Sequence, residues 1–264
     1  MEHPAYRHLE LTRDGKVTTV TLNRPEVRNA IGEELHQEIN DVFRALDADD
    51  ECDVVILTGA GGFFCGGGDL QWVLAMNGDP VYSAAGIKMG RDLQHTMLHL
   101  EKPVIAKVRG AAIGLGCTLA VFCDMVFATP DAVFSDPHVN VGLVAGDGGA
   151  VMWPHLIGYA RAKRYLLTGD SLRGSEAAEI GLITEAVPDE DLDTVVEEMA
   201  GRLAAGATNA IKWTKASINA SLRAIAGVVV DLSSQFEHAT LMTNDNRRAC
   251  EAFLAKERPV FDGT

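Results

Sequence analysis

Two glycine-rich turns constrain this chain most strongly, because each lies between a strand-like run and a helix-like run. The first turn spans residues 64–70 and follows the apolar segment 54–58, and the second spans residues 110–117 and follows the segment 103–108. Both preceding segments are enriched in β-branched residues, as buried parallel strands are. A glycine turn at a helix start leaves backbone N–H groups that can bind negative charge. The two turns therefore predict one anion site, such as an oxyanion hole.

The order of patterns along the chain indicates an α/β fold. Residues 7–22 alternate around Asp14 and Gly15, which predicts a hairpin, and Gly32 begins an amphipathic helical stretch. Strand and helix patterns then take turns to about residue 190, which predicts a mostly parallel sheet covered by helices. Residues 211–225, 228–242 and 247–253 have the pattern of successive helices without strands. We expect a core domain over residues 1–190 and a helical region over residues 191–264.

Composition narrows the class of protein. The chain has 264 residues and is 47% hydrophobic, which is enough for a substantial core. The net charge is −14 and no basic run occurs, so we expect no nucleic-acid partner. No apolar run approaches about 20 residues, so we expect no membrane partner. Five cysteines without a CxxC spacing, and no basic start followed by an apolar stretch, predict a reduced, cytoplasmic protein.

Several familiar kinds of site are not supported by the motifs. No group of histidine, cysteine, aspartate and glutamate residues has convincing metal-ligand spacing, so we expect no metal. The GxSxG motif of serine esterases is absent. Neither glycine turn satisfies GxGxxG, which argues against a nucleotide-dependent oxidoreductase.

Six segments, in order, resemble the crotonase, or enoyl-CoA hydratase/isomerase, superfamily over nearly the whole chain. They are residues 21–30, 64–70, 110–124, 134–149, 165–169 and 177–183. The resemblance implies the crotonase (ClpP-like) fold, with stacked ββα units and a C-terminal helical region that forms a homotrimer or a dimer of trimers. It also implies an acyl-CoA thioester substrate, with coenzyme A as part of the substrate and no other cofactor.

The same resemblance implies which residues bind the thioester. Its oxyanion donors are the backbone N–H groups of Gly68 and Leu115. Its substrate-binding and CoA-binding positions correspond to Arg28, Ala30, Gly66, Gly68, Asp69, Leu70 and Leu115. Asp69 is also expected to cap the helix that begins near Leu70. Because CoA is polyanionic and the chain is acidic, binding needs a local basic patch, for which the candidates are Arg24, Arg28, Lys256 and Arg258.

Both glutamates of the hydratase pattern are replaced in this chain. Thr118 stands at the first position and His138 at the second. Threonine cannot act as a general base near neutral pH, whereas histidine, with an ordinary pKa of about 6.5, can take and give a proton there. Hydration by paired carboxylates is therefore in doubt, and hydrolysis or isomerisation fits better.

Asp147 is the second ionisable residue of the catalytic loop. Pro137-His138 followed by Asp147 in a Gly-Asp-Gly turn resembles the oxocamphor hydrolase branch, in which the histidine activates water against a ketone and a C–C bond is cleaved without CoA. The acidic residue that this branch carries near the C-terminal helix falls at Ala239, with Glu237 and His238 beside it. The alternative is a purely structural role for both residues. In that case the backbone of a turn satisfies the hydrogen bonds of the His138 ring, and Asp147 caps the following helix.

Three hypotheses follow, with Gly68, Leu115, His138 and Asp147 as the catalytic set. The leading one is an acyl-CoA enzyme of crotonase type that works through an enolate. The second is a CoA-independent retro-Claisen C–C hydrolase of a cyclic β-diketone, and the third is a non-catalytic acyl-CoA binder. The acyl group depends on the packing of pocket residues, for which the candidates are Trp72, Met76, Met89, Leu93, Val144 and residues of the tail.

Overall fold

A six-stranded sheet forms the centre of the protein, described here from a computed structural model of residues 5–264. Its strand order is β1-β2-β3-β4-β6-β9. The β1 and β2 strands are antiparallel, and every other neighbouring pair runs parallel. The strands are β1 (Leu9–Asp14), β2 (Val17–Leu22), β3 (Val54–Gly59), β4 (Val104–Val108), β6 (Met125–Ala128) and β9 (Glu185–Ala186). The expected hairpin is confirmed, because Asp14 pairs with Val17 around Gly15.

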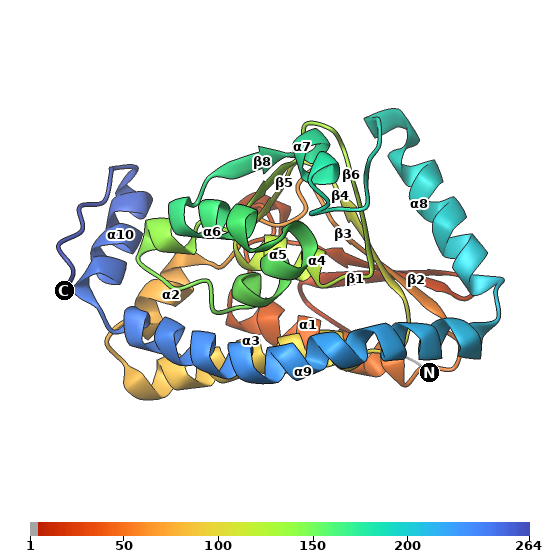
Figure 1. Cartoon of the computed structure of the whole chain (residues 1–264), viewed down its shortest axis with the longest axis horizontal. Coiled ribbons are helices and arrows are strands. Elements are labelled where there is room, and N and C mark those ends of the chain that lie inside the picture. Colours follow the sequence, from red (N-terminus) through yellow and green to blue (C-terminus); the bar gives the residue numbers. More distant parts are fainter. Residues whose placement is uncertain (1–4) are drawn as a thin grey trace.

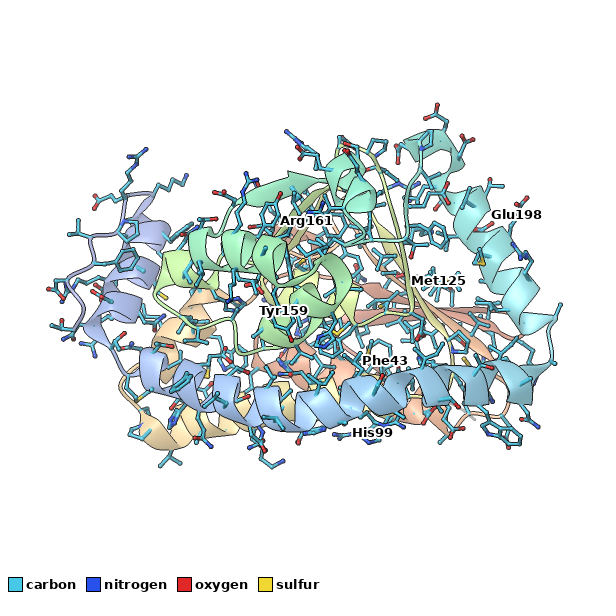
Figure 2. All side chains as sticks on the ribbon, in the orientation of Figure 1. Phe43, His99, Met125, Tyr159, Arg161 and Glu198 are labelled. Atoms are coloured by element: carbon cyan, nitrogen blue, oxygen red, sulfur yellow. The ribbon has the colours of Figure 1, made fainter. Side chains whose placement is uncertain are left out.

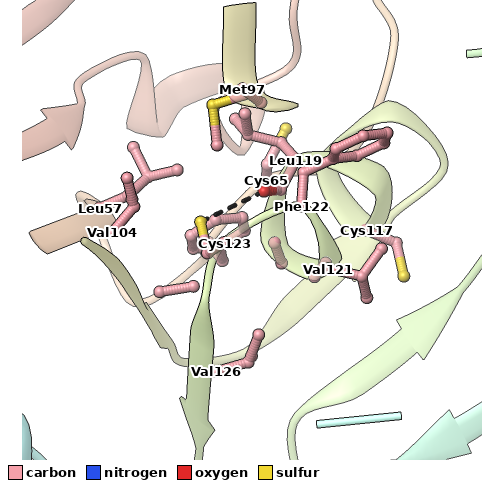
Figure 3. Packing of buried hydrophobic residues seen from close by; sticks show 14 of the residues in the cluster. Leu57, Cys65, Met97, Val104, Cys117, Leu119, Val121, Phe122, Cys123 and Val126 are labelled. Atoms are coloured by element: carbon pink, nitrogen blue, oxygen red, sulfur yellow. Dashed lines mark hydrogen bonds between the residues drawn. The ribbon is translucent and has the colours of Figure 1, made fainter. Parts of the chain in front are cut away.

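Side chains of β3 alternate between two separate cores, as the pleat of a strand requires. Val55 and Leu57 belong to the main core, whereas Val54 and Ile56 belong to a second cluster on the other side of the sheet. The continuous apolar run in the sequence therefore reflects burial on both faces. Figure 3 shows the main core from close by, where Cys123 donates a hydrogen bond to the backbone carbonyl of Leu119 at 3.3 Å.

A smaller sheet of three strands lies beside the first. It has the order β5-β7-β8, with β5 parallel to β7 and β7 antiparallel to β8. These strands are β5 (Ala111–Ile113), β7 (Val133–Ser135) and β8 (Ser171–Arg173). The second glycine-rich turn is thus shorter than the sequence indicated, because three of its residues form β5.

Helices cover both faces of the sheets (Figure 1). The first of them, α1 (Glu33–Asp47), begins after Gly32 as expected and buries one apolar face. The others before the C-terminal region are α2 (Leu70–Met76), α3 (Pro80–His99), α4 (Leu115–Val121), α5 (Gly149–Ile157), α6 (Tyr159–Thr168) and α7 (Gly174–Glu179), with short 3₁₀ turns η1 (Pro25–Val27) and η2 (His138–Val141). The alternation of strands and helices confirms the predicted α/β class.

Three helices make up the C-terminal region, namely α8 (Asp189–Ala204), α9 (Thr208–Leu241) and α10 (Asn244–Ala255). The prediction of separate helices over 211–225 and 228–242 is wrong, because α9 continues through Gly227. A glycine inside a helix costs only about 1 kcal/mol, and α9 packs along α3 and α5, which outweighs that cost. Figure 1 shows α9 running along one long edge of the molecule, with α10 at one end.

The α8 helix covers the second face of the central sheet. Its residues Leu192, Val196 and Ala200 are buried in the cluster that contains Val54 and Ile56. Glu198, labelled in Figure 2, lies on the exposed side of the same helix. The boundary predicted between residues 190 and 191 falls within the first turn of α8.

The surface of α9 is unusually apolar. Exposed large apolar residues on this helix are Trp213, Ile218, Val228, Leu232 and Phe236. By length and composition alone α9 could cross a membrane, which the sequence analysis did not anticipate. The helix instead packs on α3 and α5 and lines a cavity described below. All five cysteines are buried and unpaired with one another.

Candidate active site

The two glycine-rich turns and the segment before α1 lie side by side. The N–H of Gly66 donates to the carbonyl of Arg28 at 2.8 Å, and Ile31 forms a parallel bridge with Gly68. Cys65 forms a second bridge with Ala112 of β5. These contacts join all three segments around one point. The predicted CoA-binding residues Arg28, Ala30, Gly66, Gly68, Asp69 and Leu70 are therefore brought together.

Close approach between the turns requires glycine at one position. Gly67 has φ 98°, and a Cβ atom there would lie 2.8 Å from the carbonyl oxygen of Ile113. A side chain at this position would push the turns apart, and a positive φ is strained for any other residue.

Two backbone N–H groups at this point are free to bind an anion. Within residues 5–264, the N–H groups of Gly68 and Leu115 donate to no protein acceptor. Gly68 precedes α2, whose N-cap is Asp69, and Leu115 is the first residue of α4. The Asp69 carboxylate accepts a hydrogen bond from the N–H of Gln71 at 3.0 Å, so its predicted capping role is confirmed. Pairs of such N–H groups stabilise oxyanions.

Two adjoining cavities meet at Gly68, Leu115 and His138. The inner one, which we call the acyl cavity, has a volume of about 80 Å³, and the outer one has a volume of about 160 Å³. Side chains of α2, α3 and α9 line the acyl cavity, among them Trp72, Met76, Gln94, Ser234, Glu237 and Leu241. The outer cavity is lined by the two glycine turns and by Phe253 of α10. Trp72 and Met76 were predicted, whereas Met89, Leu93 and Val144 do not line these cavities.

His138 lies between two carboxylates at this junction. Its Nδ1 contacts Asp136 Oδ1, and its Nε2 lies 3.3 Å from Asp147 Oδ2. Asp147 Oδ1 accepts a 3.0 Å hydrogen bond from the hydroxyl of Thr118. The four side chains form a buried chain in which His138 is 11% exposed and Asp136 is fully covered. The N-cap residue of α5 is Gly148, and a hydrogen bond from the backbone of Gly149, the first residue of this helix, helps to lower the pKa of Asp147, so Asp147 contacts the helix start as well as His138.

The two carboxylates change how His138 ionises. Burial alone would lower the pKa of His138, but the charges of Asp147 and Asp136 and their hydrogen bonds outweigh burial and raise this pKa well above its ordinary value. Burial alone would likewise raise the pKa of Asp147, but His138 and the Thr118 hydroxyl lower it. The two shifts act in the same sense, because each favours a protonated His138 beside an ionised Asp147.

Glu237 of α9 belongs to the same site. Its carboxyl lines the acyl cavity, and a Cβ atom on Gly146 would lie 2.4 Å from Glu237 Oε2. Burial, followed by the charge of Asp147, raises the pKa of Glu237 to about 8. The carboxyl is consequently protonated at neutral pH and can donate a proton. His238, the other residue considered beside Ala239, is not among the lining residues.

His36 is a further residue of the acyl cavity that the sequence did not single out. It is 2% exposed and its ring meets Trp72 edge to face, with the ring centroids 6.0 Å apart. Burial lowers the pKa of His36 to about 4, so the ring is neutral at physiological pH. Its helical periodicity in α1 marked it only as part of an apolar face.

Asp136, His138 and Asp147 also bring three potential metal ligands within 4.8 Å of one another. The spacing rules missed this group, because Asp147 comes from a separate turn. A metal would need an unprotonated ring nitrogen. Both nitrogens of His138 already face carboxylates, Nδ1 in a hydrogen bond with Asp136 and Nε2 in an ion-pair contact with Asp147, so the geometry favours this arrangement over a metal site.

The basic residues predicted to bind CoA make contacts within the protein. Arg24 donates to the carbonyl of Ala30 at 2.7 Å and lies 3.7 Å from Asp69 Oδ2. The Arg28 guanidinium lies over the Phe63 ring, 5.1 Å from its centroid. Lys256 ends α10. His99, labelled in Figure 2, and His95 and His155 are exposed and lie outside the site.

Comparisons with known proteins match this geometry to one family. The sequence profile of the enoyl-CoA hydratase/isomerase family matches residues 12–264. The chain belongs to this family, the crotonase superfamily. It is 33% identical to a short-chain-enoyl-CoA hydratase of Clostridium acetobutylicum, over 94% of this chain and 95% of the relative. It is 34% identical to the 1,2-epoxyphenylacetyl-CoA isomerase of Escherichia coli, over the same shares of the two chains.

Solved crotonase structures support the same assignment. An enoyl-CoA hydratase/isomerase from Mycobacterium paratuberculosis superposes with a TM-score of 0.89 at 32% identity, covering 92% of this chain and 97% of that one. The α/β fold with a C-terminal helical region is therefore the crotonase fold. The protein is an enzyme of the enoyl-CoA hydratase/isomerase family.

Proposed function

We propose that this crotonase acts on an acyl-CoA thioester through an enolate held by the N–H groups of Gly68 and Leu115. The observation that carries the proposal is the convergence of these free N–H groups with His138 and Asp147 on one cavity junction. Coenzyme A is part of the substrate, and no separate cofactor is needed. The names of the relatives, which are CoA-thioester enzymes, support this substrate class.

The ionisation of the site assigns the proton transfers. Asp147 is the anion beside the junction, so it is the base that accepts the α-proton of the thioester or a proton of water. His138, as a cation, and Glu237, as a neutral acid, are the donors that return a proton. A β,γ-unsaturated thioester that loses its α-proton to Asp147 becomes a dienolate, and return of a proton to its γ-carbon moves the double bond and completes an isomerisation. In hydrolysis, Asp147 takes a proton from water as the water oxygen bonds to the thioester carbonyl carbon, and the C–S bond breaks to release the CoA thiol, which takes a proton from a donor of the site.

This assignment modifies the first interpretation of His138. The sequence favoured His138 as a group that both takes and gives a proton, whereas contact with two carboxylates favours donation alone. Hydration of crotonyl-CoA at an ordinary enzymatic rate is not expected, because the paired glutamates of that mechanism are replaced.

A panel of acyl-CoA thioesters tests the proposal. We expect turnover of at least one thioester by isomerisation or hydrolysis, and His138→Gln to lower kcat by about 10²–10⁴-fold, the usual contribution of general acid–base catalysis. His155→Gln is the matched control, since that ring is exposed and its contacts, with the carbonyl of Val151 and the ring of Tyr159, lie outside the site. Ordinary hydration of crotonyl-CoA would contradict the proposal. Calorimetric binding of thioesters without any turnover would indicate a non-catalytic binder.

A second function, CoA-independent C–C hydrolysis of a cyclic β-diketone, is favoured by the position of Glu237. This carboxyl lies beside the turn that holds Asp147, so the site contains an acid, a base and a cation around a small cavity. Asp147 would accept a proton from water as the water oxygen bonds to one ketone carbon. The C–C bond then breaks, and its electron pair leaves as an enolate that Glu237 protonates. Cleavage of a diketone by protein that binds no CoA would select this function.

We also propose that the enzyme is a homotrimer or a dimer of trimers. The exposed apolar residues of α9 supply a surface that such an assembly would cover. Light scattering on the purified protein checks this, and a monomer at micromolar concentration would contradict it.

A further inference from the structure

Asp136 is a buried carboxylate that the proposed reaction does not use. It is 1% exposed, and its Oδ1 contacts Nδ1 of His138, on the side of the ring opposite Asp147. Its Oδ2 has no hydrogen-bond partner among residues 5–264. A buried carboxylate needs compensation for its lost hydration, and the ring of His138 is the group in contact with it that can carry a positive charge.

The Asp136 carboxylate occupies space that is free because residue 149 is a glycine. A Cβ atom on Gly149 would lie 1.9 Å from Asp136 Oδ2, so any side chain there would displace the carboxylate. Pro137, between Asp136 and His138, limits the backbone of the short connection through its fixed φ. Gly149 and Pro137 thus fix the position of Asp136 beside the ring of His138.

We propose that Asp136 is a positioning residue that keeps both ring nitrogens of His138 protonated, so that His138 is a proton donor and Asp147 the proton acceptor. A neutral imidazole has one nitrogen with a lone pair, and that lone pair would face one of the two carboxylates without a proton between them. When both carboxyl groups are ionised, the contacts on the two sides are satisfied together only by the cation. The role in catalysis rests on the proposed function, whereas the protonation state does not.

Within residues 5–264, the ionisable groups around this ring come from five elements. Asp136 precedes η2, Asp147 precedes α5, and Glu237 comes from α9. Cys117 of α4 is near both aspartates, and burial, followed by the charges of Asp136 and Asp147, raises the pKa of its thiol. His36 of α1 is neutral at physiological pH, because burial lowers its pKa to about 4. Two carboxylates therefore act on one imidazole, and removal of Asp136 takes away half of that charge.

NMR of protein labelled with ¹⁵N at its eight histidines tests the proposal without a substrate. The signal of His138 is assigned by its disappearance in His138→Gln. In the wild-type protein we expect both ring nitrogens of His138 to give protonated shifts at neutral pH. Asp136→Asn keeps the shape of the side chain and removes its charge, and we expect it to lower the titration midpoint of His138 by about 1 pH unit or more.

Asp193→Asn is the matched control for loss of one carboxylate. Asp193 lies on α8 and pairs with Lys107 and Arg109, and it has no contact with the site. We expect the midpoint of His138 to stay unchanged in this variant. Gly149→Ala, which retains all charges but displaces the Asp136 carboxylate, should lower the midpoint as Asp136→Asn does.

The pH profile of kcat adds a readout that a purely structural role would not move. In Asp136→Asn, the limb assigned to His138 should shift with the NMR midpoint. The proposal is overturned if wild-type His138 is neutral at pH 7, or if a folded Asp136→Asn variant keeps the wild-type midpoint. The wild-type spectrum alone can overturn the proposal, so the test does not depend on whether the variant folds. A protonated His138 in a protein that turns over no thioester would contradict only the proposed function.

Discussion

Thr118 Oγ1 donates a 3.0 Å hydrogen bond to Asp147 Oδ1, which ties α4 to the turn before α5. Both residues are buried, with exposed fractions of 2% and 8%. The Thr118 hydroxyl is therefore a donor that orients the Asp147 carboxylate.

We predict that Thr118→Val destabilises the protein by about 1–3 kcal/mol, the usual cost of leaving a buried acceptor without its donor. The isosteric change keeps the volume, so the effect measures the hydroxyl. Urea unfolding monitored by circular dichroism gives the free energy of unfolding. Thr118→Ser retains the donor and should lose less. Equal stability of the valine variant and the wild type would contradict the importance of this bond.

Glu237 should make stability depend on pH with a known sign. Burial, followed by the charge of Asp147, raises the pKa of this carboxyl from 4.5 to about 8 in the folded protein. The folded state therefore holds this proton more tightly than the unfolded chain does. Its contribution to stability is fully present below the ordinary pKa and is lost as pH rises through about 8.

We predict that Glu237→Gln, which stays neutral, gains stability relative to the wild type as pH rises from about 4.5 to about 8, the interval between the ordinary and the folded pKa of Glu237. Melting temperatures of both proteins at several pH values check this. Glu198→Gln is the control, since Glu198 is exposed on α8, and its melting temperature should follow that of the wild type. A constant difference between Glu237→Gln and the wild type at all pH values would mean that Glu237 ionises as an exposed glutamate does.

The features that the sequence predicted best are those that depend on a few consecutive residues. The hairpin at Asp14, the cap at Asp69 and the buried strand β3 follow from patterns of a few residues, and all three are confirmed. The family motifs were equally readable, because each is a short segment. His138 and Asp147 were both named, nine positions apart, and the structure brings them to 3.3 Å.

What the sequence could not provide was contact across long separations. Glu237 meets the turn of Asp147 only because α9 is a single helix that reaches back over the acyl cavity. Asp136 was not singled out, because its burial beside the His138 ring cannot be inferred from sequence spacing. Gly227 suggested a helix break by local propensity, and tertiary packing overrode it.

Substitution by alanine should change the stability of the protein in opposite directions at Gly146 and at Gly227. A Cβ atom on Gly146 would lie 2.4 Å from Glu237 Oε2 and 2.7 Å from the carbonyl oxygen of Ser233. We predict that Gly146→Ala pushes α9 away from the turn and costs about 1–3 kcal/mol of stability. Around Gly227 nothing lies within 4 Å, so Gly227→Ala should stabilise α9 by about 0.5–1 kcal/mol.

Thermal unfolding of the two alanine variants measures both effects. The same measurement tests whether α9 is one helix, because a break at Gly227 would leave alanine without benefit there. If Gly146→Ala were as stable as the wild type, α9 would not be seated against the turn of Asp147.

The N-terminal half of α9 is held to the central sheet by one buried cation. Lys215 Nζ donates to Asp124 Oδ2 and to the carbonyl of Lys102, both at 2.7 Å, and its side chain is 9% exposed. Asp124 also accepts a hydrogen bond from the N–H of Val104, the first residue of β4. The pair thus links α9 to the strand that leads into the second glycine turn.

We predict that Lys215→Met destabilises the protein by about 3 kcal/mol, because it leaves the Asp124 carboxylate without its counter-charge. Adding Asp124→Asn should recover part of that loss, since it removes the stranded charge. Lys212→Met is the control on the same helix, where a looser pair with Asp53 at 3.8 Å should cost less than about 1 kcal/mol. Chemical denaturation measures all three variants. Equal losses at Lys212 and Lys215 would mean that the buried pair contributes no more than a surface contact, and that apolar packing alone holds α9 over the site.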